Sequence, residues 1–275
     1  MKRVSPANQT LGQPGYRVEA LAKGLGLLSM FTEQRPTWRL NDLALETGMP
    51  LPTAYRLAMT LTAEGYLERL SNGDYRPGVR VLTLGSAALR SLDLVELATP
   101  RLQKLAAKTG ETVNLAVLSG DQIVYLVRLR NRDLVTANIQ VGSRLPAVTT
   151  SIGKLILAFL GEKELKAHVQ AISFKGDRGP NAKRSLPELK PELTLIREQG
   201  WAGQDEEVAH GLRSVAAPVF NACGHVVAGV NIAVQARDWS NERIVSELRP
   251  LVCEAGTDIS GMLGFSASAT GQSSR

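Results

Sequence analysis

Three side chains with clear hydrogen-bonding chemistry, those of Thr53, Tyr55 and Arg56, fall within four residues of one another in the stretch 40–66. A hydroxyl and a phenol can donate to base edges or phosphate oxygens, and a guanidinium can pair with guanine through two parallel bonds. This combination favours contact with nucleic acid.

Residues arranged for catalysis or metal binding are missing from the sequence. There is no phosphate loop, dinucleotide fingerprint or zinc-spaced cluster. Ser214, His210 and Asp205 can be drawn as a triad, but a serine and a histidine four residues apart around a glycine do not give an activated nucleophile. We therefore expect no catalytic residue, no metal and no cofactor. Cys223 and Cys253 form no disulfide framework, and we expect both to be buried and inert.

The three polar side chains belong to the second of two short predicted helices. Residues 40–47 have helical spacing, Asn41 is placed to cap their first turn, and Gly48 can end the helix in the left-handed conformation. Pro52 fits only in the opening turn of a second helix, which runs to about residue 64. The pattern predicts a helix-turn-helix, although an ordinary helical hairpin in a globular core would show the same spacing.

A strand hairpin follows the second helix. Residues 65–70 and 75–76 have strand composition, and 71–74 have the composition of a turn. Helix, turn, helix and hairpin make a winged helix, which binds duplex DNA. Arginines before the first of these helices and on the wing are candidates for phosphate contacts, although a plain solvated role explains each of them equally well: Arg39, Arg69 and Arg76.

Composition sets the broad class of protein. The chain has 275 residues, 44% of them hydrophobic and 21% charged, as in soluble globular proteins. No apolar run is long enough to span a bilayer and the N-terminus lacks the apolar core of a signal peptide, so we expect a cytoplasmic protein without membrane contact. Of the net charge of +6, +4 lies in residues 1–90, which suits a surface facing phosphates.

The remaining elements follow from hydrophobic periodicity. An apolar stripe in 17–31 predicts a helix packed behind the helix pair, and 79–91 predicts a linker helix. Helix 92–109 contains Pro100, so it is either kinked there or restarted with Thr99 as its cap. We further expect strands at 112–118, 122–130, 134–141, 214–220 and 226–234, a loop at 142–146, helices at 151–160, 162–172 and 189–199, a polar loop at 176–187, and a long helix at 241–263.

Four stretches occur in an order that resembles one known family. They are GMPLPTAYRLAMTL at 48–61, VGSRLPAVTTSIGKLILA at 141–158, WAGQDEEVAHGLRS at 201–214, and the strand region 215–233. Together they resemble the IclR family of bacterial transcriptional regulators over residues 17–265, and they look closest to the subgroup that regulates aromatic-acid breakdown through the β-ketoadipate pathway. The resemblance implies an α+β protein with an N-terminal winged helix-turn-helix, a linker helix and a C-terminal GAF-like effector-binding domain.

This resemblance also implies site residues. The family usually has a threonine and an arginine where this chain has Thr53 and Arg56, but a basic or polar pair often stands where Leu51 and Pro52 are, so the base contacts differ. In the family, an effector crevice forms from a helix start, a loop, the end of the GLRS motif and a facing strand. The matching residues here are Thr150, Ser151, Ile152, Gln204, Asp205, Ser214, Asn231 and Ala233.

The chemistry of this crevice suits an organic anion. Free amides at a helix start favour a carboxylate, a neutral Gln204 admits an anion where the family often has an acid, and Ala233 leaves apolar room. Ordinary strand polarity would also account for Ser214 and Asn231. Arg213 is interpreted as a structural partner of Glu206 or Glu207 rather than a ligand-binding residue.

The sequence thus predicts a DNA-binding transcriptional regulator whose operator binding responds to a small aromatic or short-chain carboxylic acid. The expected domains are 1–15 disordered, 16–78 winged helix, 79–91 linker, 92–265 effector domain and 266–275 disordered. Expected partners are double-stranded operator DNA, the acid effector, a second copy in a homodimer or dimer of dimers joined through residues 82–89, and RNA polymerase if the protein activates. The alternative is an enzyme acting on a small acid, with the winged helix used for assembly.

Overall fold

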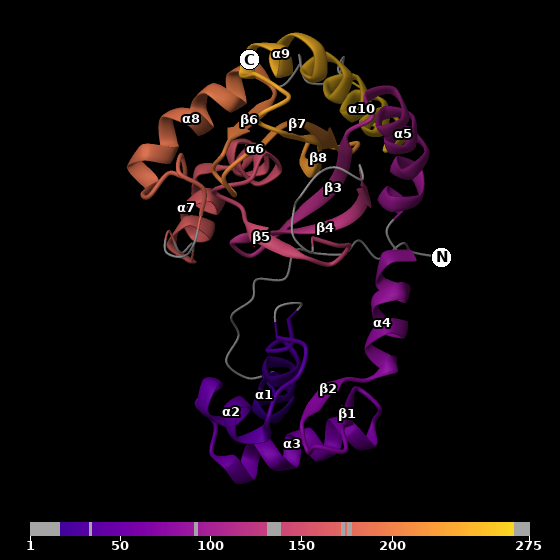
Figure 1. Ribbon diagram of the computed structural model, residues 1–275, viewed down its shortest axis with the longest axis vertical. Helices are drawn as coiled ribbons and strands as arrows, with labels where there is room; N and C mark the ends of the chain where they lie inside the picture. The colour runs from indigo at the N-terminus through magenta and orange to yellow at the C-terminus, as the bar shows by residue number, and fades with distance from the viewer. Residues whose placement is uncertain are drawn as a thin grey trace, which may run out of the picture. The chain divides into compact units, whose positions relative to one another are not determined.

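The computed structural model describes residues 17–32, 35–90, 93–130, 139–171, 174 and 178–266. It divides into two compact units, Met1–Ala88 and Leu89–Arg275 (Figure 1). The disorder expected for 1–15 and, apart from Ser266, for 266–275 lies outside the described residues, as does most of the expected strand 134–141. The described residues 139–141 form no strand.

The first unit holds four helices and a two-stranded hairpin within its described residues. Its elements are α1 (Glu19–Leu28), α2 (Leu40–Glu46), α3 (Leu51–Ala63), β1 (Leu67–Arg69), β2 (Tyr75–Pro77) and α4 (Val79–Arg90). β1 and β2 pair antiparallel, and Trp38 forms one further bridge to Tyr75. Leu27, Leu43, Ala54, Ala58 and Leu67 pack with these two aromatic rings into one core.

One local prediction for this unit is wrong, and another holds only in part. Asn41 does not cap α2, because the helix begins at Leu40 and Arg39 occupies the cap position without a side-chain bond. Helix α1 packs on α3 as predicted, and Leu28 and Phe31 contact the core. The earlier part of the predicted stripe is exposed, since Val18, Leu21 and Leu25 are 62%, 61% and 55% accessible. The face of α1 that packs on α3 instead carries Gly24 and Leu27, where the missing side chain of glycine brings Leu57 close.

The second unit is built on a six-stranded antiparallel sheet in the order β5-β4-β3-β8-β7-β6. The strands are β3 (Thr112–Ser119), β4 (Gln122–Leu129), β5 (Arg144–Pro146), β6 (Ala202–Asp205), β7 (Leu212–Phe220) and β8 (Val226–Gln235). The helices are α5 (Asp93–Thr109), α6 (Ser151–Phe159), α7 (Glu162–Ala171), α8 (Leu186–Gln199), α9 (Asn241–Arg243), the π-helical turn η1 (Ile244–Leu248) and α10 (Arg249–Met262).

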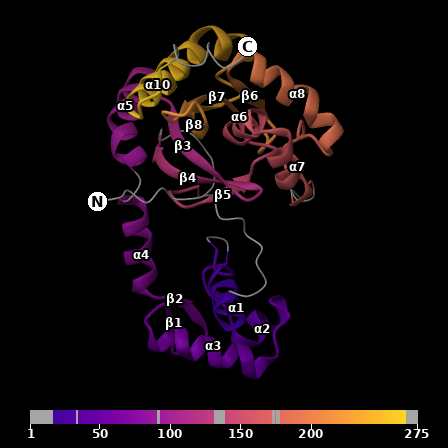
Figure 2. The same ribbon diagram turned by 180° about the vertical axis from the view of Figure 1, so that it is seen from behind.

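The sheet separates two hydrophobic cores. On one face α5 and α10 lie side by side and contribute Leu102, Val252 and Ile259 to the first core. On the other face α6 and α8 contribute Ile152, Leu155 and other apolar side chains to the second (Figures 1 and 2). Because alternate residues of a strand point to opposite faces, β3 places Leu115 in the first core and Ala116 in the second. The predicted α+β class is confirmed.

Several predicted boundaries in this unit need correction. Residues 144–146 and 202–205 form edge strands rather than loops, and three or four residues are too few for a period-two pattern to show. Helix α8 starts at Leu186, inside the predicted loop. Helix α5 continues through Pro100, and the Thr99 hydroxyl bonds back to the Val95 carbonyl instead of capping a new helix.

The last predicted helix, 241–263, is interrupted by the π turn η1 just before Pro250. A proline has no N–H for the bond to the carbonyl four residues earlier, and the wider turn accommodates its ring. Within the described residues no helix is long and apolar enough to cross a membrane, and no cluster of three or more metal-ligating side chains occurs.

Candidate functional site

The turn between α2 and α3 has the geometry of a helix-turn-helix. Gly48 adopts φ +64°, and the Met49 amide donates to the Ala44 carbonyl at 2.9 Å, so the last turn of α2 closes back on itself. Pro50 occupies the cap position of α3, and Pro52 lies in its first turn, where an amide proton is not needed. The two prolines therefore restrict the backbone where α3 begins, and Gly48 permits the left-handed turn before it.

Helix α3 exposes two of the three predicted DNA-binding residues. Tyr55 and Arg56 are exposed, whereas Thr53 is half-buried on the side of the helix. Arg56 takes part in no ion pair within the described residues, and the Thr60 hydroxyl donates to its backbone carbonyl at 2.9 Å. The guanidinium of Arg56 thus stands on the outer face of α3 with its charge uncompensated.

The other predicted phosphate-binding arginines differ in their local partners. Arg76 pairs with Glu68 across the wing at 2.9 Å, and Arg39 lies 3.8 Å from Asp74. Among the described residues, Arg69 has no acidic partner. Its side chain therefore carries a net charge at the wing, whereas the charges of Arg76 and Arg39 are partly neutralised.

In the second unit, the start of α6 forms one wall of a small cavity. The Thr150 side chain caps the helix by accepting from the Gly153 amide at 3.0 Å, and the Thr150 carbonyl accepts from the Lys154 amide. Gly153 is required there, because a Cβ would lie 2.2 Å from the Ala147 carbonyl oxygen. Gly229 on β8 is required for a similar reason, since a Cβ would lie 2.8 Å from Ile152. These close approaches hold α6 tightly against the sheet.

The cavity lies on the α6 side of the sheet and has a volume of about 20 Å³. That is room for about one water molecule. Its polar lining comes from β3, β4, β6, β7, β8 and the cap of α6, and its apolar lining from β5, β7, β8, Ile139 and Val208. The lining residues are Asn114, Tyr125, Arg128, Ile139, Leu145, Thr150, Gln204, Val208, Leu212, Ser214, Asn231 and Ala233.

A continuous chain of hydrogen bonds runs along the floor of this cavity. Arg128 donates to the Asn114 side-chain oxygen at 3.0 Å, and the Asn114 amide donates to Asn231 at 2.8 Å. Asn231 donates to the Ser151 hydroxyl at 3.3 Å, which lies 2.7 Å from the Ser214 hydroxyl. Asn114 and Asn231 face each other across the β3–β8 pair, so the register of these two strands brings their side chains into hydrogen-bonding contact.

Six of the eight predicted effector residues meet at the cavity. Thr150, Gln204, Ser214, Asn231 and Ala233 line it, and Ser151 joins it through its hydroxyl. Ile152 does not reach it, because its side chain packs against β8 in the second core.

Asp205 was expected on a loop beside the ligand, but it lies on β6 with its side chain on the opposite face from Gln204. It pairs there with Arg213 at 2.6 Å and accepts from Asn241 at 3.0 Å. Burial raises the pKa of Asp205, but the bonds from Arg213 and Asn241 outweigh burial and hold it below its usual value. The structural role predicted for Arg213 fits this geometry, with Asp205 as the partner instead of Glu206 or Glu207.

Sequence reasoning missed the polar residues contributed by β3 and β4. Asn114 is the one amide in the apolar run 112–118, and Arg128 and Tyr125 are polar positions of the next strand. Burial raises the pKa of Tyr125 to about 12, while Arg128 acts in the opposite direction. The Tyr125 phenol is therefore neutral near pH 7 and can donate a hydrogen bond.

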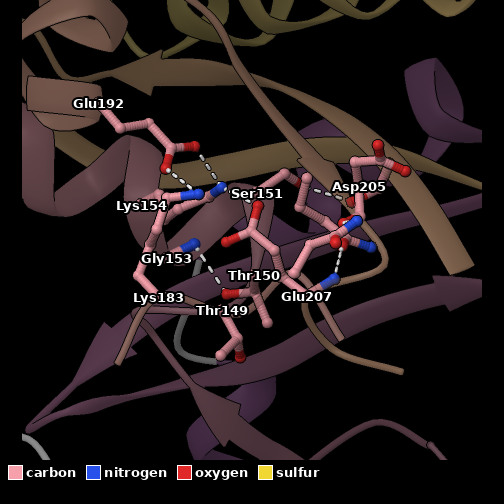
Figure 3. A network of polar contacts seen from close by, with 12 residues as sticks. Thr149, Thr150, Ser151, Gly153, Lys154, Lys183, Glu192, Asp205 and Glu207 are labelled. Carbon is pink, nitrogen blue, oxygen red and sulfur yellow. Dashed lines mark hydrogen bonds and ion pairs between the residues drawn. The ribbon is translucent and has the colours of Figure 1, made fainter. Parts of the chain in front are cut away.

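A buried ion cluster holds α6 from behind the cavity (Figure 3). Lys154, which is fully buried, pairs with Glu192 of α8 at 2.5 Å and with Glu207 of the loop after β6. Lys183 lies 3.8 Å from the second oxygen of Glu192. Burial raises the pKa of Glu207, and Lys154 opposes that rise. The Glu207 amide donates to the Gln204 side chain at 2.9 Å, so the cluster is bonded directly to a cavity wall.

The residues of the possible triad do not assemble. Ser214 is bonded to Ser151, Asp205 to Arg213, and the His210 ring lies 2.7 Å from Glu206. The expectation that both cysteines are buried is wrong, because Cys223 is exposed on the turn between β7 and β8 and Cys253 is half-buried.

Comparison with known proteins matches both units to one family. Residues 20–71 match the IclR helix-turn-helix domain, and residues 86–261 match the C-terminal domain of bacterial IclR transcriptional regulators. The chain is 30% identical to the HTH-type transcriptional regulator XynR of Escherichia coli K12 over 91% of this chain and 99% of that protein. It is equally identical to the Pca regulon regulatory protein of Pseudomonas putida over 90% and 84%, so identity alone does not select a subgroup.

A solved structure supports the fold. It is an IclR homologue from Microbacterium hydrocarbonoxydans complexed with 4-hydroxybenzoate, with a TM-score of 0.73, 24% identity, and coverage of 89% of this chain and 98% of that one. The enzyme alternative finds no support among proteins named as transcriptional regulators. With both domain models in chain order and relatives matched over nearly their whole length, this chain belongs to the IclR family of DNA-binding transcriptional regulators.

Proposed function

We propose that the cavity at the start of α6 is the effector site of this regulator and that its ligand is a small aromatic or short-chain carboxylic acid. The observation that carries the proposal is the chemistry of the walls. Tyr125, Arg128 and Ser214 offer hydrogen-bond donors, while none of the described lining residues is Asp or Glu. A site rich in donors and free of acidic side chains favours an anion.

The hydrogen-bond chain along the cavity floor strengthens this preference. Arg128 can only donate, so it fixes the Asn114 oxygen toward itself and the Asn114 amide toward Asn231. Asn231 then donates to Ser151, which leaves the Ser151 proton for Ser214 and the Ser214 proton for a ligand. Every proton in the chain points away from the guanidinium, and successive bonds of this kind polarise one another.

The α6 terminus adds to the same field. Thr150 occupies the amides of Gly153 and Lys154, so the earlier amides of the first turn remain for a ligand carboxylate. The Microbacterium homologue is complexed with 4-hydroxybenzoate, an acid of this class. A cavity of about 20 Å³ is too small for such a molecule, so binding must displace part of the wall. A ligand that binds only the displaced arrangement has a higher affinity for it, and it therefore shifts the equilibrium toward that arrangement.

The effector proposal is tested by calorimetry on the full-length protein with pairs of acids and neutral analogues, such as benzoate with benzamide and 4-hydroxybenzoate with its methyl ester. We expect saturable binding of at least one acid and none of its neutral analogue. Arg128→Met should weaken binding about ten- to a hundredfold, since a hydrogen bond to a charged group contributes about 1.5–3 kcal/mol. Arg237→Met, at an exposed arginine of the same unit, should bind normally. Equal binding of the amide would contradict the proposal.

On the DNA side, we propose that α3 enters the major groove, with Arg56 on phosphate or guanine, Tyr55 and Thr53 near base edges, and Arg69 on phosphate. Arg39 and Arg76 contribute less, because contact with DNA must first weaken their pairs with Asp74 and Glu68. Arg56→Ala should abolish operator binding in a mobility-shift assay and leave acid binding unchanged. Retained operator affinity would contradict this docking.

We also propose a homodimer, alone or paired into a dimer of dimers. In the first unit, exposed apolar side chains follow one face of α1 and the start of α4, namely Val18, Leu21, Leu25, Val79 and Leu82, all more than half accessible. Burying such a face is favourable, and a two-fold dimer matches palindromic half-sites. Leu82→Glu should shift the sedimentation coefficient toward the monomer; an unchanged value would exclude this face. If the protein activates transcription, RNA polymerase is a further partner.

A further inference from the structure

The exposed surface of α3 carries a row of three large, mainly apolar side chains. Leu51, Tyr55 and Met59 are 45%, 48% and 41% exposed. Their spacing of four residues places them in one row along the helix. The side chains that pack α3 into the unit, Ala54 and Ala58, lie on the adjoining buried face. Among the described residues of this unit, none of Leu51, Tyr55 and Met59 belongs to the hydrophobic core.

Apart from the phenol of Tyr55, polar groups are few on the exposed surface of α3. Arg56 is the one charged residue among the exposed positions of α3. Thr60 is exposed, but its hydroxyl proton is donated to the Arg56 carbonyl at 2.9 Å. Pro52, beside Leu51, has neither an amide proton nor a polar side chain. Hydrogen-bond donors thus account for a small part of the surface that α3 offers.

The major groove contains one apolar group, the C5 methyl of thymine, and apolar side chains distinguish thymine by contact with it. We propose that the Leu51–Tyr55–Met59 row selects operator sequence by burying thymine methyl groups, while Arg56 supplies the one charged contact of α3. This inference rests on the docking of α3 proposed above, and it names the chemical group of the bases that α3 recognises.

The dimensions of the helix agree with this assignment. Residues four apart on a helix are about 6 Å apart along its axis, and successive base pairs are about 3.4 Å apart. Neighbouring members of the row thus lie about two base pairs apart. Because the N-terminal part of a recognition helix lies deepest in the groove, Leu51 and Tyr55 should make the main contacts and Met59 a peripheral one.

The test begins with duplexes selected from a random library by the full-length protein at fixed salt. Each thymine of the selected site is then replaced, one at a time, by deoxyuridine, which removes the methyl and keeps every hydrogen-bonding group. We expect one or two positions at which affinity falls about fourfold, the value for losing one buried methyl-sized group. Enrichment without any deoxyuridine effect would overturn this inference and leave the docking standing. No enrichment of any duplex would overturn both.

Variants identify the side chains that read the methyl groups. In Leu51→Ala or Tyr55→Ala the deoxyuridine penalty should vanish at one position and persist at the others. In Arg69→Ala, which removes a proposed phosphate contact of the wing, overall affinity should fall while the penalty stays near fourfold. The melting temperatures of these variants should match that of the parent, because the altered side chains are exposed. Met59→Ala is the third variant of the row. The assignment would be overturned by a deoxyuridine penalty that persists in all three variants. A changed oligomeric state without loss of the penalty would overturn it as well.

Discussion

Replacing Lys154 by methionine tests how the ion cluster behind the cavity stabilises the second unit. Methionine fills a similar volume but leaves Glu207 and Glu192 without their shared cation. Glu207 is the costlier loss, because its side chain is 5% exposed whereas that of Glu192 is 24% exposed and keeps Lys183 nearby. Breaking a buried pair on one side costs about 3–5 kcal/mol. For a domain of this size, about 1 kcal/mol lowers the melting temperature by about 2–4 °C, so we expect a fall of about 6–20 °C.

The loss should depend on pH in a defined direction. Burial raises the pKa of Glu207 above its unfolded value, and Lys154 opposes that rise. Without Lys154 the folded-state pKa rises further, so the folded state binds more protons than the unfolded state between the two pKa values. Stability then falls as pH rises through that interval. The variant should be closest to the parent below the unfolded pKa of about 4.3 and furthest from it above the raised pKa.

The assay is thermal unfolding of the full chain followed by tryptophan fluorescence between pH 4 and 8, since Trp201 and Trp239 both lie in the second unit. Lys154→Met/Glu207→Gln should recover most of the loss, because the amide removes the unpaired buried charge. Lys166→Met is the matched control, as Lys166 is 66% exposed and lies 3.9 Å from Glu162. A loss below about 1 kcal/mol for Lys154→Met, or a double variant no more stable than the single one, would refute the reasoning.

Three further predictions concern single positions. Gly179→Ala should lower the melting temperature and acid affinity together, because a Cβ would lie 1.8 Å from the Glu206 carbonyl oxygen; Gly26→Ala, in open space on α1, should not. Ser260→Ala should destabilise by about 1–3 kcal/mol in denaturant titration, since its hydroxyl accepts the Phe220 amide at 2.8 Å and the amide would lose its partner. Arg69→Ala should reduce the salt slope of DNA binding by about 1, and Arg76→Ala by less, because Arg76 pairs with Glu68; equal slopes would contradict this ranking.

The winged helix was largely predictable from local sequence because local rules control it. Gly48, Pro50 and Pro52 restrict the backbone at the turn, and the hairpin follows from Asn72 and Gly73. The packing face of α1 was not predictable by the same means. Its strongest apolar stripe is exposed, and Gly24, which looks like a break in the pattern, marks the close approach to α3.

The proposed effector pocket was predictable only in part, because its walls combine local and distant segments. Thr150, Ser151 and Ser214 belong to motifs that the resemblance brings together. Asn114 and Arg128 reach the cavity only through the antiparallel pairing of β3 with β8 and β4, and a single sequence does not specify that register. Asp205 was misplaced because β6 is too short to show the alternation that turns Gln204 inward and Asp205 outward.

These walls differ in how firmly they are held, and the difference indicates where a ligand must make room. Helix α6 is fixed by the contact of Gly153 with Ala147, by the contact of Ile152 with Gly229, and by Lys154. The opposite wall includes β5, an edge strand of three residues that pairs only with β4 among the described strands. Because this edge strand has a partner strand on one side only, we expect its opening to cost less free energy than a shift of α6. In the proposed site we therefore expect the carboxylate end of the ligand to meet a rigid, polarised surface and the space for its body to come from the β5 side.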